Sequence, residues 1–451
     1  MPTKIVAIDL ERPLPTQVAD AARYDAVWAI VRRHGIPIGQ VVIDNCRTPV
    51  LAIQLRSEIL RQLGKQLLQG QDVHAPDFAQ AVGCAPRQAG AEWAAEPELA
   101  DLLPALSPKT GRRFFLSVVV CTRDRPQDLQ MCLETLVALE PGRHQLEIIV
   151  VDNNPASGQT EAVVADFPQV RYEAELRPGV AYGRNKGLIA AKGDIVAYID
   201  DDVKVPAHWP SRILAPFADE RVMCVSGLVL PLEMENESQE MFEKYGALGR
   251  GYRPRLFDER FFRSPKHVVH TWDLGGTANV AIRKSVLPDS GMFDETLGPG
   301  QPTGVGEDIY MFYRILKAGH ICYYEPAAYV WHKHRTTMRA LRQQLYNYNK
   351  GQTSYQLRTL VTDGDRRVIR QLLWDLPRWH VRRIWEIVRG RQDYSLRLVL
   401  LEIWGNLVGP LAFWRAVRQH RRLNGPGANP IGGAAVGENG RSPETDLIEL
   451  R

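Results

Sequence analysis

A regular alternation of short apolar runs and helical segments, beginning at Phe114, constrains the fold more than any other feature. The runs FFLSVVVCT (114–122), LEIIVVDN (146–153) and DIVAYID (194–200) are continuous and β-rich. The segments between them, such as PQDLQMCLETLVALE (126–140), repeat apolar residues at helical intervals. Strands without polar alternation, separated by amphipathic helices, predict a parallel sheet covered on both faces. We therefore expect a mostly parallel α/β domain over residues 113–334, with right-handed crossovers.

The rest of the chain follows other patterns. Residues 1–75 combine an alternating run, GIPIGQVVID, with a helical stripe of leucine and isoleucine, which predicts a small α+β unit. Residues 76–112 are rich in Ala, Pro and Gly and predict a linker. Residues 335–423 have helical patterns, and the Gly- and Pro-rich residues 424–451 predict a disordered tail.

Composition places the chain among globular proteins. Of 451 residues, 45% are hydrophobic and 24% charged, with a net charge of +4. The six cysteines form no C-x-x-C pair, so neither a zinc site nor a disulfide framework is indicated, and we expect a reducing, cytoplasmic location. The N-terminal sequence does not read as a secretory signal. No window holds 18 uninterrupted apolar residues, so we expect no simple membrane-spanning helix.

Three consecutive aspartates, Asp200, Asp201 and Asp202, end the apolar run DIVAYID. On a surface, such a run is ordinarily a solvated turn or a helix N-terminus. Here it follows a buried strand of a parallel sheet, and ligands bind such sheets beyond the carboxyl ends of the strands. A hard divalent cation that also binds a diphosphate would offset the repulsion among the carboxylates.

Five motifs occur in a fixed order along the α/β region. They are LSVVVCTRDRP (116–126), IIVVDNN (148–154), RPGVAYGRNKGLIAAKGDIVAYIDDD (177–202), GGTANVAIRKSVL (275–287) and GVGEDIYMFYRILKAG (304–319). Together they resemble the family 2 inverting glycosyltransferases, which have the GT-A fold, a Rossmann-like sheet flanked by helices. The resemblance covers about residues 114–334, half of the chain.

The resemblance implies a set of donor-binding residues. The family contacts the nucleotide after its first strand, its nucleobase at the end of the second, and the ribose and diphosphate through an A-R-N element and an acid of the aspartate run. The matching residues in this chain are Thr122, Arg123, Asp152, Arg184, Asn185 and Asp201.

The resemblance also implies a metal site and a base. Asp202, with Asp200 as its partner, matches the acid that binds Mn²⁺ or Mg²⁺, and His332 matches a histidine that completes the site. His334 is the alternative ligand, and a surface histidine beside basic residues is the plainer interpretation of both. Asp308 matches the catalytic base, with Glu307 as the second choice; in isolation, this acidic pair is explained equally well by helix capping.

The region after the α/β domain is basic and rich in tryptophan. Residues 331–425 hold 19 Lys and Arg against six Asp and Glu, together with six of the ten tryptophans. One interpretation is a helical subdomain packed on the core. The other is a surface that rests on a membrane through residues 331–423, on its inner face, because Trp and Arg beside apolar stripes suit the headgroup region. No recognisable nucleic-acid-binding motif is present.

We therefore expect a metal-dependent enzyme that moves a sugar from a nucleotide-sugar donor to a hydroxyl of a glycan, lipid-linked or small-molecule acceptor. A nucleotidyltransferase is an alternative, although the early Gly-rich loop of that class is missing. A non-catalytic nucleotide-sugar-binding protein is another, although the acids of a catalytic site are present. The sequence does not specify the donor sugar, the acceptor or the oligomeric state.

Overall fold

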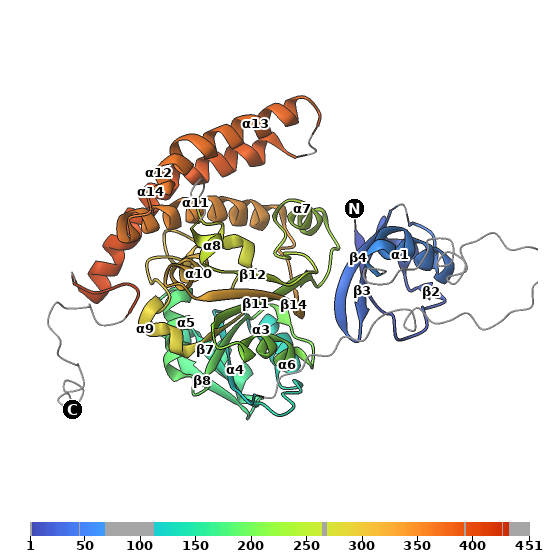
Figure 1. Cartoon of the computed structure of the whole chain (residues 1–451), viewed down its shortest axis with the longest axis horizontal. Helices are drawn as coiled ribbons and strands as arrows, with labels where there is room; N and C mark the ends of the chain where they lie inside the picture. Colours follow the sequence, from blue (N-terminus) through green and yellow to red (C-terminus); the bar gives the residue numbers. More distant parts are fainter. Residues whose placement is uncertain are drawn as a thin grey trace, which may run out of the picture.

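The structure is a computed structural model that describes residues 2–44, 46–67, 112–263, 268–391, 394–425 and 427–432. Figure 1 shows a central α/β domain with a small N-terminal unit on one side and a layer of long helices on another. The predicted linker lies almost entirely outside the described residues, as does most of the predicted disordered tail.

The central sheet has nine strands in the described part of the chain. Eight follow the order β10-β14-β11-β13-β9-β6-β7-β8, and β12 (Arg255–Phe257) pairs with β14. Their bounds are β6 Phe115–Thr122, β7 Gln145–Asp152, β8 Val170–Ala174, β9 Ile195–Asp200, β10 Val203–Lys204, β11 Val222–Pro231, β13 Asn279–Arg283 and β14 Ile321–His332. The strands β9, β6, β7 and β8 are mutually parallel, whereas β13 runs antiparallel to both its neighbours. The predicted mostly parallel sheet is confirmed.

Both faces of this sheet are buried, as its continuous apolar strands require. Along β6, Val119 faces one core cluster, while Val118 and Val120 face the other. The helix α3 (Pro126–Leu136) packs four buried side chains into the second cluster, and α5 (Val180–Ala190) packs into the first. The remaining helices of the domain are α4 (Gln159–Ala165), α6 (Trp209–Leu214), α7 (Glu237–Gly246), α8 (Glu259–Phe262), α9 (Leu287–Ser290) and α10 (Glu307–Lys317).

The N-terminal unit is the predicted α+β fold. Its sheet has the order β1-β3-β4, formed by Thr3–Asp9, Ala26–Arg33 and Ile36–Asp44, and α1 (Ala52–Leu67) covers one face. Two short strands, β2 (Gln17–Val18) and β5 (Val50–Leu51), pair separately. The unit docks beside β14: Arg32 donates a hydrogen bond of 2.7 Å to Tyr329, and the Thr3 N–H donates one of 2.7 Å to the Met234 carbonyl.

The helical region begins with α11 (Met338–Asp363), which lies over the α/β domain (Figure 1). After α12 (Arg367–Arg370) and a π-helical turn, α13 (Leu376–Val388) leads to α14 (Leu396–Asn424), which packs along α11. By length and composition alone α14 could cross a membrane. By the stricter criterion of 18 uninterrupted apolar residues α14 does not qualify, because Arg397 and Glu402 interrupt the run.

Candidate active site

The predicted acids lie at the carboxyl ends of parallel strands, along one edge of the sheet. Thr122, Asp152 and Asp200 are the last residues of β6, β7 and β9, which are neighbours in the sheet. A pocket of about 940 Å³ opens at this edge. Its walls come from the segment after β6, the aspartate run, the loop before β13, residues 299–309, the end of β14 and α11. The pocket thus lies beyond the carboxyl ends of the strands, where a ligand of such a sheet is expected.

A candidate metal centre lies in this pocket. One ligand atom from each of Asp200, Asp202 and His332 can be chosen so that all three lie within 4.8 Å of one another. The Oδ1 atom of Asp202 is buried and accepts no hydrogen bond, although His332 Nε2 lies 3.2 Å away. A buried carboxylate oxygen without a partner is costly. A hard divalent cation coordinated by carboxylate oxygens and an imidazole nitrogen fits this donor set.

A chain of hydrogen bonds fixes which nitrogen of His332 faces the centre. The Glu243 carboxylate lies 2.6 Å from His334 Nε2, and His334 Nδ1 lies 3.1 Å from His332 Nδ1. Because a carboxylate only accepts, neutral His334 carries its proton on Nε2 and accepts at Nδ1. His332 must then donate from Nδ1, which leaves its Nε2 lone pair directed at Asp202. Burial lowers the pKa of His332, which favours this neutral form.

Arg125 offsets the repulsion between Asp201 and Asp202, two of the three consecutive aspartates. Arg125 contacts Asp201 with one guanidinium nitrogen and donates to Asp202 Oδ2 at 2.7 Å with the other. The Thr122 hydroxyl donates to the second oxygen of Asp201 at 2.6 Å. Both carboxylates are almost fully buried, and burial raises the pKa of Asp201 to about 7. Asp201 is therefore held by protein groups, whereas Asp200 remains partly exposed.

Glu307 and Asp308 open α10 but have different surroundings. Glu307 is buried and forms an ion pair with Arg184, whose guanidinium also lies 3.6 Å from Asp200. Burial raises the pKa of Glu307 to about 7. Asp308 is only half-buried and lines the pocket, with Oδ1 accepting the Ile309 N–H at 2.7 Å. Gly276 leaves room beside it, since a Cβ there would lie 3.2 Å from Asp308 Oδ2.

The other predicted donor residues divide into two groups. Thr122 and Arg123 line the pocket. Asp152 and Asn185 do not line it: Asp152 is fully buried and accepts hydrogen bonds from the Tyr172 hydroxyl and the Asn154 N–H. The Asn185 side-chain amide accepts a hydrogen bond from the Phe293 N–H and donates one to the Phe293 carbonyl, each at 2.9 Å.

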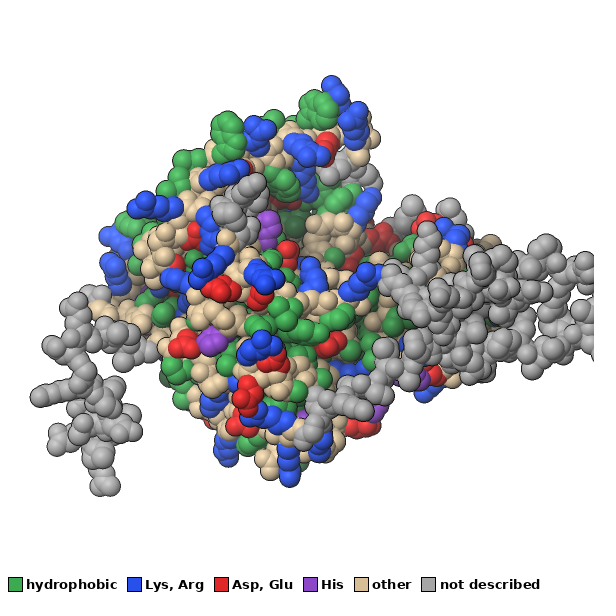
Figure 2. Space-filling view, viewed as in Figure 1, with side chains coloured by type: hydrophobic (Ala, Val, Ile, Leu, Met, Phe, Trp, Pro, Cys, Tyr) green, Lys and Arg blue, Asp and Glu red, His purple; other side chains and the backbone are tan. Residues whose placement is uncertain are grey.

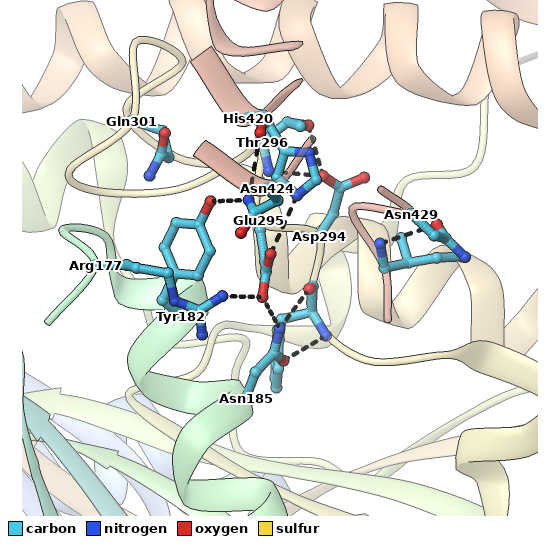
Figure 3. Close-up of polar contacts among 12 residues, drawn as sticks. Arg177, Tyr182, Asn185, Asp294, Glu295, Thr296, Gln301, His420, Asn424 and Asn429 are labelled. Carbon is cyan, nitrogen blue, oxygen red and sulfur yellow. Dashed lines mark hydrogen bonds and ion pairs between the residues drawn. The ribbon is translucent and has the colours of Figure 1, made fainter. Parts of the chain in front are cut away.

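The end of α14 is fixed to the same part of the domain. Figure 3 shows Glu295 between Asn185 and His420, with His420 Nε2 3.1 Å from the carboxylate. Asn424 donates to the Tyr182 hydroxyl of α5 at 3.1 Å. The loop that leaves Phe293 continues to Gln301 in the pocket wall. These contacts connect the last turns of the chain's longest described helix to the pocket.

Sequence reasoning missed two contributors to the pocket. Arg125 stood within the quoted motif TRDRP but had no assigned role. The helix α11 lies beyond the predicted domain boundary at residue 334, yet it supplies pocket-lining side chains, namely Ala340, Gln343, Gln344, Asn347, Tyr348, Lys350 and Gln352. Its contact is close: a Cβ on Gly304 would lie 3.1 Å from the Asn347 side chain, and one on Gly351 would lie 2.3 Å from Val305.

Comparison with known proteins identifies the α/β domain. The family model described as glycosyl transferase family 2 matches residues 117–278. Residues 117–278 belong to glycosyltransferase family 2. This match ends before Glu307, Asp308 and His332, so these three residues are placed by the structure and by the motif order.

Known glycosyltransferases are among the similar proteins. A pre-mycofactocin glycosyltransferase from Mycobacterium tuberculosis is 29% identical over 230 residues, which are 50% of this chain and 44% of that protein. A glucosyl-dolichyl phosphate glucuronosyltransferase from Haloferax volcanii is 26% identical over 189 residues, 41% of this chain and 57% of that protein. Among solved structures, a mannosyltransferase from Pyrobaculum calidifontis in complex with GDP-Man and Mn²⁺ has a TM-score of 0.40 and 16% identity, covering 72% of this chain and 79% of that one. The chain spans less than half the length of the mycobacterial relative.

Proposed function

We propose that this chain is a metal-dependent inverting glycosyltransferase, which moves a sugar from a nucleoside-diphosphate donor to a hydroxyl acceptor. The observation that carries this proposal is the meeting, in one pocket, of a candidate metal centre and the half-buried carboxylate of Asp308. The pocket belongs to a family 2 domain and lies at the carboxyl edge of its parallel strands. The residues that would hold Mn²⁺ or Mg²⁺ are Asp200, Asp202 and His332.

The chemistry divides between the two groups. Asp308 takes the proton of the acceptor hydroxyl as its oxygen forms a bond to the anomeric carbon of the donor. The bond from that carbon to the diphosphate oxygen breaks on the opposite face, and the nucleoside diphosphate leaves with the electron pair. A bound divalent cation would stabilise charge on the diphosphate. Arg125 and Arg335, which also line the pocket, are placed to attract the same anion.

The wall formed by α11 supports a hydroxyl-rich acceptor. It presents the amides of Gln343, Gln344 and Asn347 to the pocket, beside the ring of Tyr348. An amide both donates and accepts hydrogen bonds, which matches sugar hydroxyls that do the same. We assign the α11 wall to a glycan or lipid-linked glycan acceptor, and the wall that includes Arg123 to the nucleotide.

A donor panel tests the proposal. The full chain is incubated with nucleotide sugars of different bases and sugars, with Mn²⁺, Mg²⁺ or EDTA, and with mono- and disaccharide acceptors. We expect nucleoside diphosphate release with one donor class, its loss in EDTA, and its recovery on adding the cation. Full activity in EDTA would contradict the metal requirement. Pyrophosphate release from a nucleoside triphosphate and a sugar phosphate would instead support the nucleotidyltransferase alternative, and donor binding without release would support a binding protein.

A further inference from the structure

We propose that the outer face of α13 and α14 is a membrane-binding surface, which lies on an anionic phospholipid leaflet. We call it the Trp–Arg face and define it by five exposed tryptophans, Trp374, Trp379, Trp385, Trp404 and Trp414, with the arginines and aliphatic side chains around them. The proposal does not depend on the reaction that the pocket catalyses. It concerns a surface on the helical layer, which Figure 1 shows over the α/β domain.

The exposed apolar side chains form one stripe along α14 and a second along residues 369–388, which include α13. On α14 they recur every three or four residues, at Leu396, Leu400, Trp404, Leu407, Leu411 and Trp414, each at least 41% exposed. This spacing keeps them on one side of the helix over about 27 Å. The preceding segment carries a second set at Ile369, Leu373, Trp374, Trp379, Val381, Trp385 and Val388. Single exposed apolar residues are ordinary, but contiguous stripes mark an interaction surface.

Arginine accompanies the tryptophans. Guanidinium groups lie over the rings of Trp374, Trp379, Trp385 and Trp414, at 3.7–5.3 Å from the ring centroid for the nearest arginine of each. Figure 2 shows Lys and Arg side chains interspersed with hydrophobic ones over this region. Such a pair has an apolar body and a cationic edge, which suits the boundary between acyl chains and phosphates.

The positive charge of this region favours an anionic membrane over a second copy of the chain as the binding partner. Residues 366–424 hold 13 arginines, no lysine and four acidic residues, an excess of +9. A second copy of the chain would bring the same positive face against this one, so self-association through it is opposed by repulsion. An anionic leaflet offers both attraction to the arginines and an apolar layer for the rings. The inner leaflet of the cytoplasmic membrane has this character, which would place the enzyme peripherally on that side.

The structure favours a helix that lies on the membrane over one that crosses it. The side of α14 opposite its exposed stripe is packed against α11: a Cβ on Gly405 would lie 2.7 Å from the Tyr346 carbonyl, and Asn406 accepts a hydrogen bond from Thr353 at 3.0 Å. Glu402 is buried against Arg383 and Tyr394. A crossing helix would have to take Glu402 and Asn406 from these partners into hydrocarbon, which is costly.

Vesicle binding by the full chain tests the proposal. We expect co-sedimentation with phosphatidylcholine vesicles that contain about one third phosphatidylserine, weak binding to pure phosphatidylcholine, and a decline as salt is raised, because screening shortens the range of the attraction. Replacing Arg378, Arg389 and Arg418 by Gln should lower affinity on the order of 10²-fold. The matched control replaces Arg12, Arg112 and Arg221 by Gln, an equal change of net charge on other surfaces, and should have little effect.

The apolar contribution is tested separately. Trp374, Trp385 and Trp404 changed to Ala should weaken binding even at high salt, whereas Ile53→Ala with Ile189→Ala, two exposed residues elsewhere, should not. Should the triple variant fail to fold, quenching of wild-type tryptophan fluorescence by brominated lipid reports the same contact. Three results would overturn the proposal: no vesicle binding at low salt, a tryptophan-dependent dimer that binds no lipid, or resistance to alkaline extraction, which would indicate a crossing helix.

Discussion

At the scale of single residues, Glu307 and Asp308 are adjacent in sequence but have different surroundings in the structure. Glu307 is committed to Arg184, and Asp308 faces the pocket. Asp308→Asn keeps the shape and the hydrogen bond to Ile309 but cannot accept a proton. We expect turnover to fall on the order of 10²-fold or more, with unchanged binding of the nucleoside diphosphate, measured by calorimetry, and an unchanged melting temperature.

Glu307→Gln is the matched control for this pair. It weakens the buried partner of Arg184, so we expect a loss of about 1–3 kcal/mol in the free energy of unfolding, with a smaller effect on turnover per folded molecule. The reverse result, normal turnover in Asp308→Asn and loss in Glu307→Gln without destabilisation, would assign the base to Glu307.

The histidine pair makes a second residue-scale prediction. Because Glu243 sets the proton position on His334, and His334 sets that on His332, Glu243→Gln should make His332 Nε2 a poorer ligand. We expect Mn²⁺ affinity to fall by about 10–100-fold, measured by titration calorimetry without donor. The fold should be retained, because glutamine has a similar size and can still form a hydrogen bond with His334. Its amide can donate as well as accept, however, so it no longer fixes the proton on His334 Nε2.

Glu237→Gln, at the exposed first residue of the same helix α7, removes an equal charge without touching the histidines and should leave Mn²⁺ affinity unchanged. A Glu243→Gln variant that binds Mn²⁺ like the wild type would show that the chain of hydrogen bonds does not position the ligand. Equal weakening in both variants would point instead to the general negative charge of the helix.

At the scale of elements, the contact between α11 and α14 depends on glycine. A Cβ on Gly409 would lie 2.6 Å from the Thr353 Cβ and 2.9 Å from the Lys350 carbonyl. Gly409→Ala should therefore push the helices apart and destabilise the protein by about 1–3 kcal/mol, seen as a lower melting temperature. Because α11 lines the pocket, the Michaelis constant for the acceptor should rise as well.

Gly427→Ala, where a Cβ meets nothing within 4 Å, is the control and should leave both measurements unchanged. An equally stable Gly409→Ala variant would mean that α14 can shift without strain. Its pairing with α11 would then not be fixed by close approach.

Elements whose pattern follows from burial could be predicted from the sequence, whereas roles that depend on contacts between distant residues could not. The strands β6, β7 and β9 are buried on both faces, so their apolar runs were unambiguous, and the acids at their ends were correctly placed at one edge. The role of α11 was not predictable, because a polar helix face reads as solvent-exposed until a partner is seen. Arg125 was missed for a similar reason: its partners, Asp201 and Asp202, lie 76 and 77 positions away. Asn185 matched a family motif, but its bonds to Phe293 depend on tertiary contact.

At the scale of the whole molecule, the helical layer packs as part of the α/β domain's structure rather than as an appendage. The motifs end by His334, so the sequence alone predicts that a truncation near residue 370 spares the α/β domain. The structure argues otherwise, because α14 covers α11 and bonds Glu295 and Tyr182 through His420 and Asn424. We expect a chain ending at residue 370 to melt at a lower temperature and to lose transfer activity, while a chain ending at residue 432 keeps both. Full activity of the shorter chain would show that α14 is dispensable.

Because α11 lies between the pocket and α14, it determines how far the pocket would be from a membrane in contact with α14. One side of α11 lines the candidate pocket, and α14, which carries the Trp–Arg face, packs along another. Packed helix axes are about 8–10 Å apart, so a leaflet in contact with α14 would lie roughly one helix layer beyond the pocket wall. The thickness of the helical layer would therefore limit which acceptors can react. An acceptor anchored in that leaflet reaches Asp308 only if the distance from the lipid phosphates to its reactive hydroxyl is comparable to that thickness. Acceptor choice would then be governed by length as well as by chemistry.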